Sequence, residues 1–250
     1  MPAVETRGLV KEFRGFRAVD RVDLRVEEGT VHGLVGPNGA GKTTLFNMLS
    51  SFLKPTAGQV LVRGQDVTGQ PPEKVARLGV GRSFQITRLF EQLTVAEHIS
   101  LALQSQTSLG HRFWLPEREM ARFRNRSLEL LADVDLAALA DREVHTLPYG
   151  QKRALELALV LARDPWLLLL DEPTAGMAAD EVGPITALIR RASAGRTVVL
   201  VEHNMGVVSQ LTDHVTVLES GKILVEGPYD QVRRDPRVVA AYLGEADEHA

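Results

Sequence analysis

The residues of this chain that are best suited to chemistry form a glycine-rich run at residues 36–44, GPNGAGKTT. It follows an apolar stretch typical of a strand, 31–35, and opens a stretch typical of a helix, 43–53. Such a loop lets backbone N–H groups converge on a phosphate, while its lysine reaches the β and γ oxygens and its hydroxyl ligates Mg²⁺. We therefore predict a nucleoside triphosphate site rather than a plain glycine-rich turn. The predicted nucleotide ligands are Gly36, Pro37, Asn38, Gly39, Ala40, Gly41, Lys42, Thr43 and Thr44.

Two adjacent carboxylates follow a second apolar stretch. Residues 167–170 are all leucine, and Asp171 and Glu172 come directly after them. A buried strand that ends this way places its carboxylates at the edge of the sheet where ligands of such folds bind. Asp171 is suited, like Thr43, to hold Mg²⁺, and Glu172 is suited to polarise the water that attacks the γ-phosphate. A solvated turn is the alternative for such a pair taken alone.

A histidine and a glutamine extend this set. His203 follows the apolar stretch 197–201, so we expect it at the same sheet edge, where it can bind the γ-phosphate. Taken alone, a histidine after a strand is more often a surface or core residue. Gln85 lies where the strand pattern gives way to a helical one, and its amide is expected to reach Mg²⁺ or the attacking water. The predicted catalytic groups are Lys42, Gln85, Glu172 and His203, and the predicted metal ligands are Thr43, Gln85 and Asp171.

The composition narrows the setting of this chemistry. The 250 residues carry a net charge of −3, which gives no general attraction to nucleic acid or to anionic lipid. There is no cysteine, which excludes disulfides and thiol catalysis. Residues 1–10 lack the pattern of a signal peptide, and no stretch approaches the ~18 apolar residues of a membrane span. We expect a cytoplasmic protein whose membrane role would come through a partner.

The order of patterns along the chain predicts an α/β fold. Alternating apolar residues at 19–26 and at 60–62 indicate antiparallel strands. The stretches 95–104, 117–131 and 151–162 are helical in pattern, with no strand pattern between them. Short apolar strands then alternate with helices, as at 167–170 and 197–201, which implies a parallel sheet covered on both faces.

Together these motifs resemble the ATP-binding cassette (ABC) ATPases, the motor subunits of membrane transporters. The resemblance covers nearly the whole chain and depends on the glycine-rich run, on Gln85, on LPYGQKR at 147–153, on LLLLDEPTAG at 167–176 and on His203. It implies a P-loop NTPase fold with a RecA-like core and parallel sheet, an antiparallel β subdomain and a helical subdomain. One ABC domain would span 1–250, with its core in 1–85 and 166–250 and the helical subdomain in 86–165.

The same resemblance implies ATP and Mg²⁺ as cofactors and a second subunit as partner. In the family, the signature segment meets the γ-phosphate of ATP held by a second, head-to-tail ATPase subunit. That role falls here on Gly150 and Gln151, which open a helical run whose N-terminus favours an anion by ~0.3–2 kcal/mol. Phe13 stands where the family places an aromatic ring that stacks on the base. Taken alone, Phe13 is interpreted as a core residue.

Two positions depart from the family pattern. The family's LSGGQ reads LPYGQ here, and Pro148 offers the γ-phosphate neither a hydroxyl nor an amide hydrogen. Ala178 replaces an aspartate that makes a contact across subunits in the family, and Asp180 is a poor substitute for it. We expect hydrolysis to persist, because the groups that act within one subunit are present.

Within the family, the chain looks like the ATPases of branched-chain amino acid uptake systems. The motifs that carry this are FQ at 84–85, RLF at 88–90, LTV at 93–95, the PYGQ form of the signature, VEHNM at 201–205 and AYLGE at 241–245. The resemblance implies a second ATPase subunit, identical or different, two transmembrane permease subunits and, indirectly, a substrate-binding protein outside the membrane. It places the chain on the inner face of the cell membrane, with no nucleic acid partner.

The role of three arginines and three alternative functions of the chain remain open. Arg118, Arg122 and Arg126 have helical spacing and either face acidic groups of a membrane partner or form a solvated face. The same ATPase could serve another cargo, such as urea, short amides or exported lipopolysaccharide. A soluble ABC ATPase acting on DNA or the ribosome is disfavoured, because the chain has no second cassette, coiled-coil insertion or basic tail. A phosphotransferase is disfavoured because no acceptor-binding segment is readable.

Overall fold

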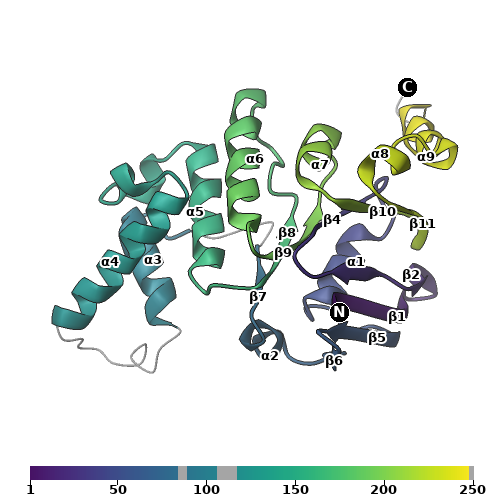
Figure 1. The fold of residues 1–250 in the computed structure, drawn as a ribbon, viewed down its shortest axis with the longest axis horizontal. Helices are drawn as coiled ribbons and strands as arrows, with labels where there is room; N and C mark the ends of the chain where they lie inside the picture. The colour runs from purple at the N-terminus through teal and green to yellow at the C-terminus, as the bar shows by residue number, and fades with distance from the viewer. Residues whose placement is uncertain (84–88, 106–116, 248–250) are drawn as a thin grey trace. The chain divides into compact units, whose positions relative to one another are not determined.

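The computed structural model describes residues 1–83, 89–105 and 117–247, and Figure 1 shows their arrangement. Their contacts divide the chain into two compact units. Unit 1 contains Met1–Arg82, Trp166–Glu172 and Ser193–Ala250, and unit 2 contains Ser83–Pro165 and Pro173–Ala192. The domain boundaries expected from the sequence, at 85 and 166, remain a prediction. In the contacts, residues 173–192 group with the helical part of the chain.

The larger sheet of unit 1 has the strand order β11-β10-β4-β9-β8-β7. Only β11 runs antiparallel to its neighbour; the other pairs are parallel. The strands are β4 (Val31–Val35), β7 (Val80–Arg82), β8 (Leu167–Asp171), β9 (Thr197–Val201), β10 (His214–Glu219) and β11 (Lys222–Gly227). Every residue of β4, β8 and β9 is buried, as expected for central parallel strands covered on both faces.

The second sheet of unit 1 is antiparallel and has the order β2-β1-β5-β6, with β3 also paired to β1. Its strands are β1 (Pro2–Phe13), β2 (Phe16–Val22), β3 (Arg25–Glu27), β5 (Ala57–Val62) and β6 (Gln65–Asp66). The two sheets together agree with the predicted α/β fold that combines a parallel sheet with an antiparallel subdomain.

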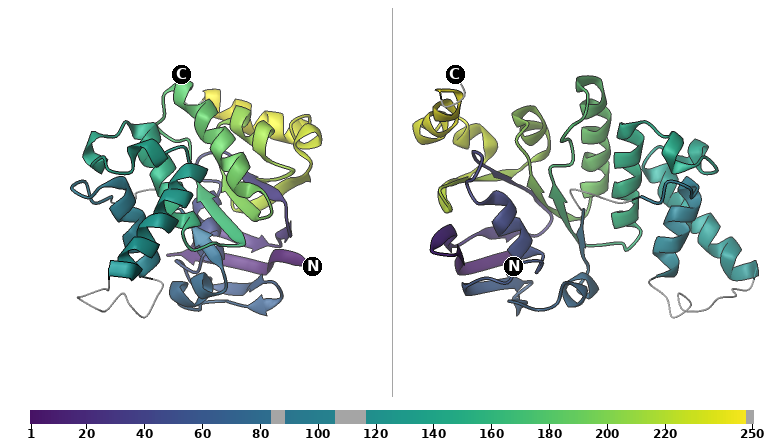
Figure 2. Two further views of the ribbon diagram at one scale, coloured as in Figure 1. Left: turned by 60° about the vertical axis from the view of Figure 1, so that its left-hand side comes forward. Right: turned by 180° about the vertical axis from the view of Figure 1, so that it is seen from behind.

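Helix α1 (Lys42–Leu49) connects the two sheets of unit 1. It contacts β2 of the antiparallel sheet and β8 and β9 of the parallel sheet, and Figures 1 and 2 show it between them. Its Phe46 side chain is fully buried in a core that includes residues of both sheets. The helix expected over 43–53 ends earlier, because Ser51 adopts a left-handed backbone with φ of 59°. Both sheets therefore hold the helix that follows the glycine-rich run.

The remaining helices of unit 1 are short or close to the chain end. They are α2 (Pro72–Arg77), α7 (Met205–Leu211), α8 (Tyr229–Val232) and α9 (Pro236–Asp247). A smaller apolar cluster joins α7, α8 and α9 to the parallel sheet through Val208, Val232 and Val238, which pack with Val35 and Val217. The carboxyl half of the chain thereby stabilises the strand that leads into the glycine-rich run.

Unit 2 is helical among its described residues, as predicted. Its elements are α3 (Val95–Gln104), α4 (Glu117–Asp133), α5 (Tyr149–Leu161), α6 (Ala179–Ser193, of which the last residue belongs to unit 1) and the 3₁₀ turns η2 (Ala137–Leu139) and η3 (Val144–Thr146). Thr94 and Glu97 form a reciprocal capping box that fixes the start of α3. Within the described part of the chain, none of the helices combines the length and the hydrophobicity that crossing a bilayer requires.

Candidate nucleotide site

The glycine-rich run turns from β4 into α1 in a conformation that only glycine tolerates. Gly36 and Gly41 have φ of 147° and 98°, and Gly41 is the N-cap of α1. A Cβ atom at Gly36 would collide with the carbonyl oxygen of Leu218, and one at Gly41 with that of Ala18. The two glycines are therefore required both by the backbone angle and by the close approach of β10 and β2.

Lys42 lies across this loop. Its ammonium donates hydrogen bonds to the carbonyl oxygens of Gly36, at 2.6 Å, and of Pro37, at 2.7 Å, and the residue is 8% exposed. No acidic residue occupies the first turn of α1, so the positive end of the helix dipole adds to the lysine charge. Thr43 is exposed and Thr44 is half-buried at the same helix end. This end of α1 has the donors and the charge that a polyphosphate requires.

The register of the parallel sheet brings the other candidate groups to the same edge. Val201 of β9 is paired with Asp171 of β8 on one side and with Leu34 of β4 on the other. The three strands therefore end nearly level, and Glu172, His203 and the glycine-rich run all follow at the carboxyl edge. This is where open parallel sheets bind their ligands.

Asp171 is a buried carboxylate at this edge. Its side chain is 2% exposed, and the guanidinium of Arg82 lies 3.6 Å from its Oδ2. Burial raises the pKa of Asp171, with a further rise from Glu172, and the charge of Arg82 acts in the opposite direction. Arg82 was not recognised from the sequence, because nothing in its local pattern shows that β7 delivers it to the end of β8.

The oxygen groups here suit Mg²⁺. Within the described ranges, no cluster of three or more His, Cys, Asp or Glu side chains could hold a metal ion by itself. Mg²⁺ usually binds through one or two carboxylates, hydroxyl or water oxygens and the phosphates of the nucleotide. The carboxylate of Asp171 and the hydroxyl of Thr43 match that incomplete set of ligands.

Glu172 has a left-handed backbone with φ of 46°, which is rare outside glycine. Its N–H donates to the carbonyl oxygen of Val201 at 2.9 Å, so the turn is attached to β9. Such a backbone costs about 1–3 kcal/mol and is concentrated at functional sites. The side chain is partly exposed, as a group that polarises a water molecule must be.

His203 stands on a turn that its neighbours fix. The backbone N–H groups of His203 and Asn204 donate to the carboxylate of the fully buried Glu202 at 3.0 and 3.2 Å. Asn204 in turn caps α7 by accepting from the N–H groups of Gly206 and Val207. His203 itself is exposed at the sheet edge. The Asn204 cap has a recognisable sequence signal, an asparagine before a helical run, whereas the role of Glu202 has none.

Phe13 is 45% exposed at the tip of the β1–β2 hairpin, so its interpretation as a core residue is wrong. The ammonium of Lys11 lies 5.0 Å from its ring centroid. An exposed ring of this kind is free to stack on a base. Gln85, the remaining predicted ligand, lies outside the described residues, and its roles in catalysis and metal binding remain predictions.

The signature segment belongs to unit 2 and surrounds the start of α5. Pro148 is the N-cap and makes no side-chain cap hydrogen bond. The N–H of Gly150 donates to Oε1 of Glu181 at 3.1 Å, while Oε2 of the same carboxylate accepts from the N–H of Ala178 at 3.2 Å. Among the residues that the structure describes, the buried Oε1 of Gln151 finds no hydrogen-bond partner. Nothing in the sequence indicates that Glu181 binds an amide that is expected to meet a phosphate.

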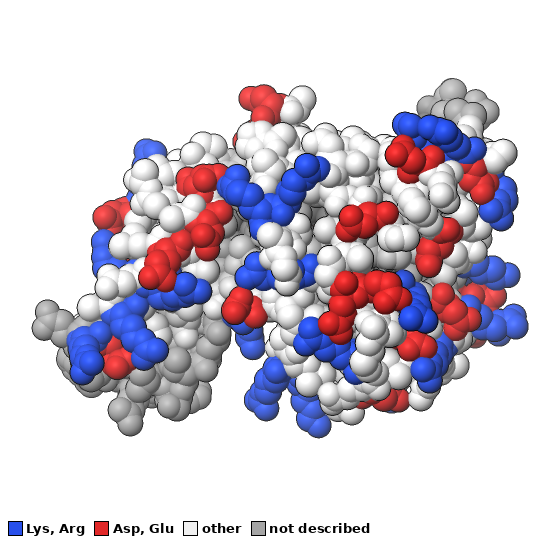
Figure 3. Space-filling model, viewed as in Figure 1, with Lys and Arg blue, Asp and Glu red and all other residues white. Residues whose placement is uncertain are grey.

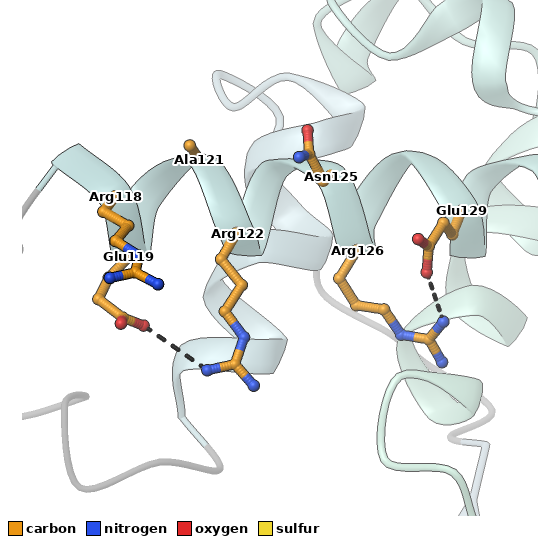
Figure 4. A pocket seen from close by; sticks show the side chains of 7 residues that line it. All are labelled: Arg118, Glu119, Ala121, Arg122, Asn125, Arg126 and Glu129. Carbon is orange, nitrogen blue, oxygen red and sulfur yellow. Dashed lines mark hydrogen bonds and ion pairs between the residues drawn. The ribbon is translucent and has the colours of Figure 1, made fainter.

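The three arginines of α4 lie along one side of that helix (Figure 4). Arg122 pairs with Glu119 at 3.9 Å and Arg126 with Glu129 at 2.7 Å, so carboxylates interrupt the basic row. Figure 3 shows basic and acidic side chains intermixed over much of the surface turned to the viewer. The local pairing favours the interpretation of this row as a solvated face.

Comparison with known proteins identifies the class to which this chain belongs. Residues 19–175 match the family described as ABC transporter, so the chain belongs to that family. Residues 222–248 match a second family, described as branched-chain amino acid ATP-binding cassette transporter.

Individual relatives cover nearly the whole chain. BraF of Pseudomonas aeruginosa, named a high-affinity branched-chain amino acid transport ATP-binding protein, is 41% identical over 98% of this chain and 99% of its own length. LivG of Escherichia coli K12, with the same description, is 38% identical over 98% and 99%. A crystal structure of an ABC transporter cassette in its ADP conformation superposes with a TM-score of 0.87 at 31% identity, covering 98% of this chain and 99% of that one. A nucleotide-free cassette gives 0.85 at 30% identity, covering 97% and 99%.

Proposed function

We propose that this chain is the ATP-hydrolysing motor subunit of an ABC importer for branched-chain or other hydrophobic amino acids. The observation that carries the proposal is the similarity to BraF and LivG over 98% of the chain, together with the separate match of residues 222–248 to the branched-chain amino acid cassettes. The close approach of the glycine-rich run, Asp171, Glu172 and His203 to one sheet edge supports it.

Each group at that edge has a distinct task in the proposed reaction. Lys42 and the backbone N–H groups of the glycine-rich run bind the β- and γ-phosphates, and Phe13 stacks on the adenine. Thr43 and Asp171, with Gln85, hold Mg²⁺, which neutralises charge on the phosphate oxygens when it is bound. Glu172 polarises the attacking water, and His203 donates a hydrogen bond to the γ-phosphate.

The proposed ATPase subunit acts together with partner subunits. A second ATPase subunit, identical or different, places its bound ATP against Gly150 and Gln151 in a head-to-tail pair. ATP binding closes this pair and hydrolysis reopens it. Two transmembrane permease subunits receive the motion on the cytoplasmic face of the membrane, and a substrate-binding protein on the other side selects the cargo.

The test is to purify the chain in lipid nanodiscs together with the proposed permease subunits and second ATPase subunit. Phosphate release is measured with the binding protein loaded with leucine, loaded with urea, or empty. We expect leucine to stimulate hydrolysis several-fold, and a Glu172→Gln complex serves as the inactive control. If urea or an amide stimulates hydrolysis and leucine does not, the transported substrate is not a branched-chain amino acid. A wild-type complex that hydrolyses no ATP would overturn it.

A further inference from the structure

Arg82, the last residue of β7, lies in a buried polar cluster that the proposed reaction does not use. Its Nη2 donates to Oδ1 of Asn47 at 2.6 Å, and its Nη1 donates to the hydroxyl of Ser50. The same Nη2 lies 3.6 Å from Oδ2 of Asp171. Only 12% of the Arg82 side chain is exposed. The guanidinium therefore contacts the end of α1 and the end of β8 at once.

Two aromatic rings enclose this cation. The guanidinium carbon lies 4.9 Å from the ring centroid of Phe46 and 4.7 Å from that of Phe52. Both distances are within the range of cation–π attraction. Burial lowers the pKa of Arg82 and the nearby Asp171 raises it. Because burying a charge is unfavourable unless it is paired, this arrangement differs from a solvated surface arginine.

The contacts of Arg82 are unequal. Hydrogen bonds from its Nη2 and Nη1 go to Asn47 and Ser50, whereas its separation from Asp171 is longer than a hydrogen bond. The guanidinium is thus anchored on α1 and presents its charge to Asp171 from a fixed place. Helix α1 starts with the phosphate and metal groups Lys42 and Thr43. One side chain consequently connects β7, α1 and β8, the elements that lead to or carry the predicted metal ligands.

We propose that Arg82 is a positioning residue for Asp171: its fixed charge holds the carboxylate in the orientation in which it receives the magnesium nucleotide. This inference rests on the proposed function. Without the cation, the buried carboxylate next to Glu172 loses an opposite charge that orients it. The contribution of the metal to nucleotide affinity should then fall, while metal-free nucleotide binding through the glycine-rich run should remain.

The experiment measures binding of a non-hydrolysable ATP analogue to the full-length chain by calorimetry, once with Mg²⁺ and once with EDTA. Arg82→Gln should reduce the affinity gained from Mg²⁺ by about tenfold or more and change the EDTA affinity by less than about threefold. Arg82→Lys keeps the positive charge but not the forked geometry of the guanidinium, so the affinity that it gains from Mg²⁺ should lie between the values of Arg82→Gln and wild type. Arg77→Gln removes an exposed arginine of the same unit and is the matched control.

If Mg²⁺ increases the nucleotide affinity of Arg82→Gln as much as that of wild type, or more, the inference is overturned. A larger increase would show that the arginine competes with the metal. If both Arg82 variants fail to fold, Asn47→Ala decides the question. It removes the anchor at 2.6 Å and leaves the charge, so it should lower the Mg²⁺ gain several-fold, and no change would count against the proposal. Wild-type protein that neither binds nor hydrolyses magnesium ATP would instead refute the proposed function.

Discussion

The sheet edge of unit 1 and the signature segment of unit 2 are built in different ways. At the sheet edge, Lys42 and Asp171 are both buried; carbonyl groups of the loop hold Lys42, and Arg82 holds Asp171. At the start of α5, Tyr149 is 42% exposed, and the N–H of Gly150 is bound by Glu181. Groups proposed to act within the subunit are thus fixed by the fold. The amide proposed to act on a partner's ATP is held by a side chain that must exchange for phosphate.

The largest effect is expected at the sheet edge, from Glu172→Gln. Loss of the group that polarises water should lower turnover by ~10² to 10⁴ while ATP binding persists. Phosphate release and calorimetry on the same preparation measure the two quantities separately. Turnover close to wild type would mean that another group activates the water.

Lys42→Ala tests the phosphate assignment in the same region. Charge-assisted hydrogen bonds contribute about 1.5–3 kcal/mol each, so ATP affinity should fall roughly 10- to 150-fold. The exposed Lys74 provides a control in Lys74→Ala, which should bind ATP as wild type does. Equal affinities in the two variants would contradict the placement of the phosphates over the glycine-rich run.

A pH titration tests how strongly the parallel sheet of unit 1 depends on a buried histidine. Burial, with a smaller contribution from His214, lowers the pKa of His32 to about 4, and its Nε2–H donates to the hydroxyl of Thr216, which donates to Glu226. The unfolded chain binds this proton near pH 6.5 and the folded chain does not. Stability from His32 is therefore present above pH 6.5 and is lost as pH falls towards 4, by about 2 kcal/mol at pH 5.

His32→Gln removes this titration while keeping a side chain that can hydrogen-bond Thr216. Between pH 7 and pH 5 the variant should lose about 2 kcal/mol less of its free energy of unfolding than wild type, as measured by urea denaturation. Parallel losses in both proteins would show that His32 is protonated in the folded chain or does not control acid stability.

The smallest effect is expected at the signature segment, from Glu181→Gln. Removing a negative charge next to the N-terminus of α5 should favour a partner's phosphate there by about 0.3–1 kcal/mol. In the Glu172→Gln background, ATP-driven pairing should therefore strengthen up to about fivefold in analytical ultracentrifugation. Pro148→Ser restores the family's hydroxyl at the same surface. An association constant that neither change moves would show that this end of α5 does not limit pairing.

The sequence predicts those elements of the fold whose own residues show a clear local pattern. Strands β4 and β9 have the predicted bounds, because each is a run of five buried residues that are mostly apolar. Helix α3 also has its predicted bounds, consistent with the capping box at its start. Strand β1 was missed, because register shifts along its pairings with β2, β3 and β5 interrupt the alternation of a strand.

The residues of the candidate site likewise fall into those that the local sequence indicates and those that depend on distant contacts. The glycine-rich run, Asp171 and Glu172 are contiguous with the elements that position them, so their spacing in the sequence was enough to propose them as candidates. Arg82 and Glu181 act through contacts with residues 89 and 31 positions away in the chain, and a single sequence does not show which residue will be the neighbour of another.

The close packing of the two glycines has a consequence for how this protein matures. The carbonyl groups of Leu218 and Ala18 pack against Gly36 and Gly41. Leu218 belongs to β10, so the glycine-rich turn is completed by a strand that is synthesised long after it. A nascent chain halted before residue 218 would carry every residue proposed to bind phosphate and yet lack the carbonyl group that packs against Gly36. Completion of this turn therefore waits for the late, long-range pairing of β10 with β4.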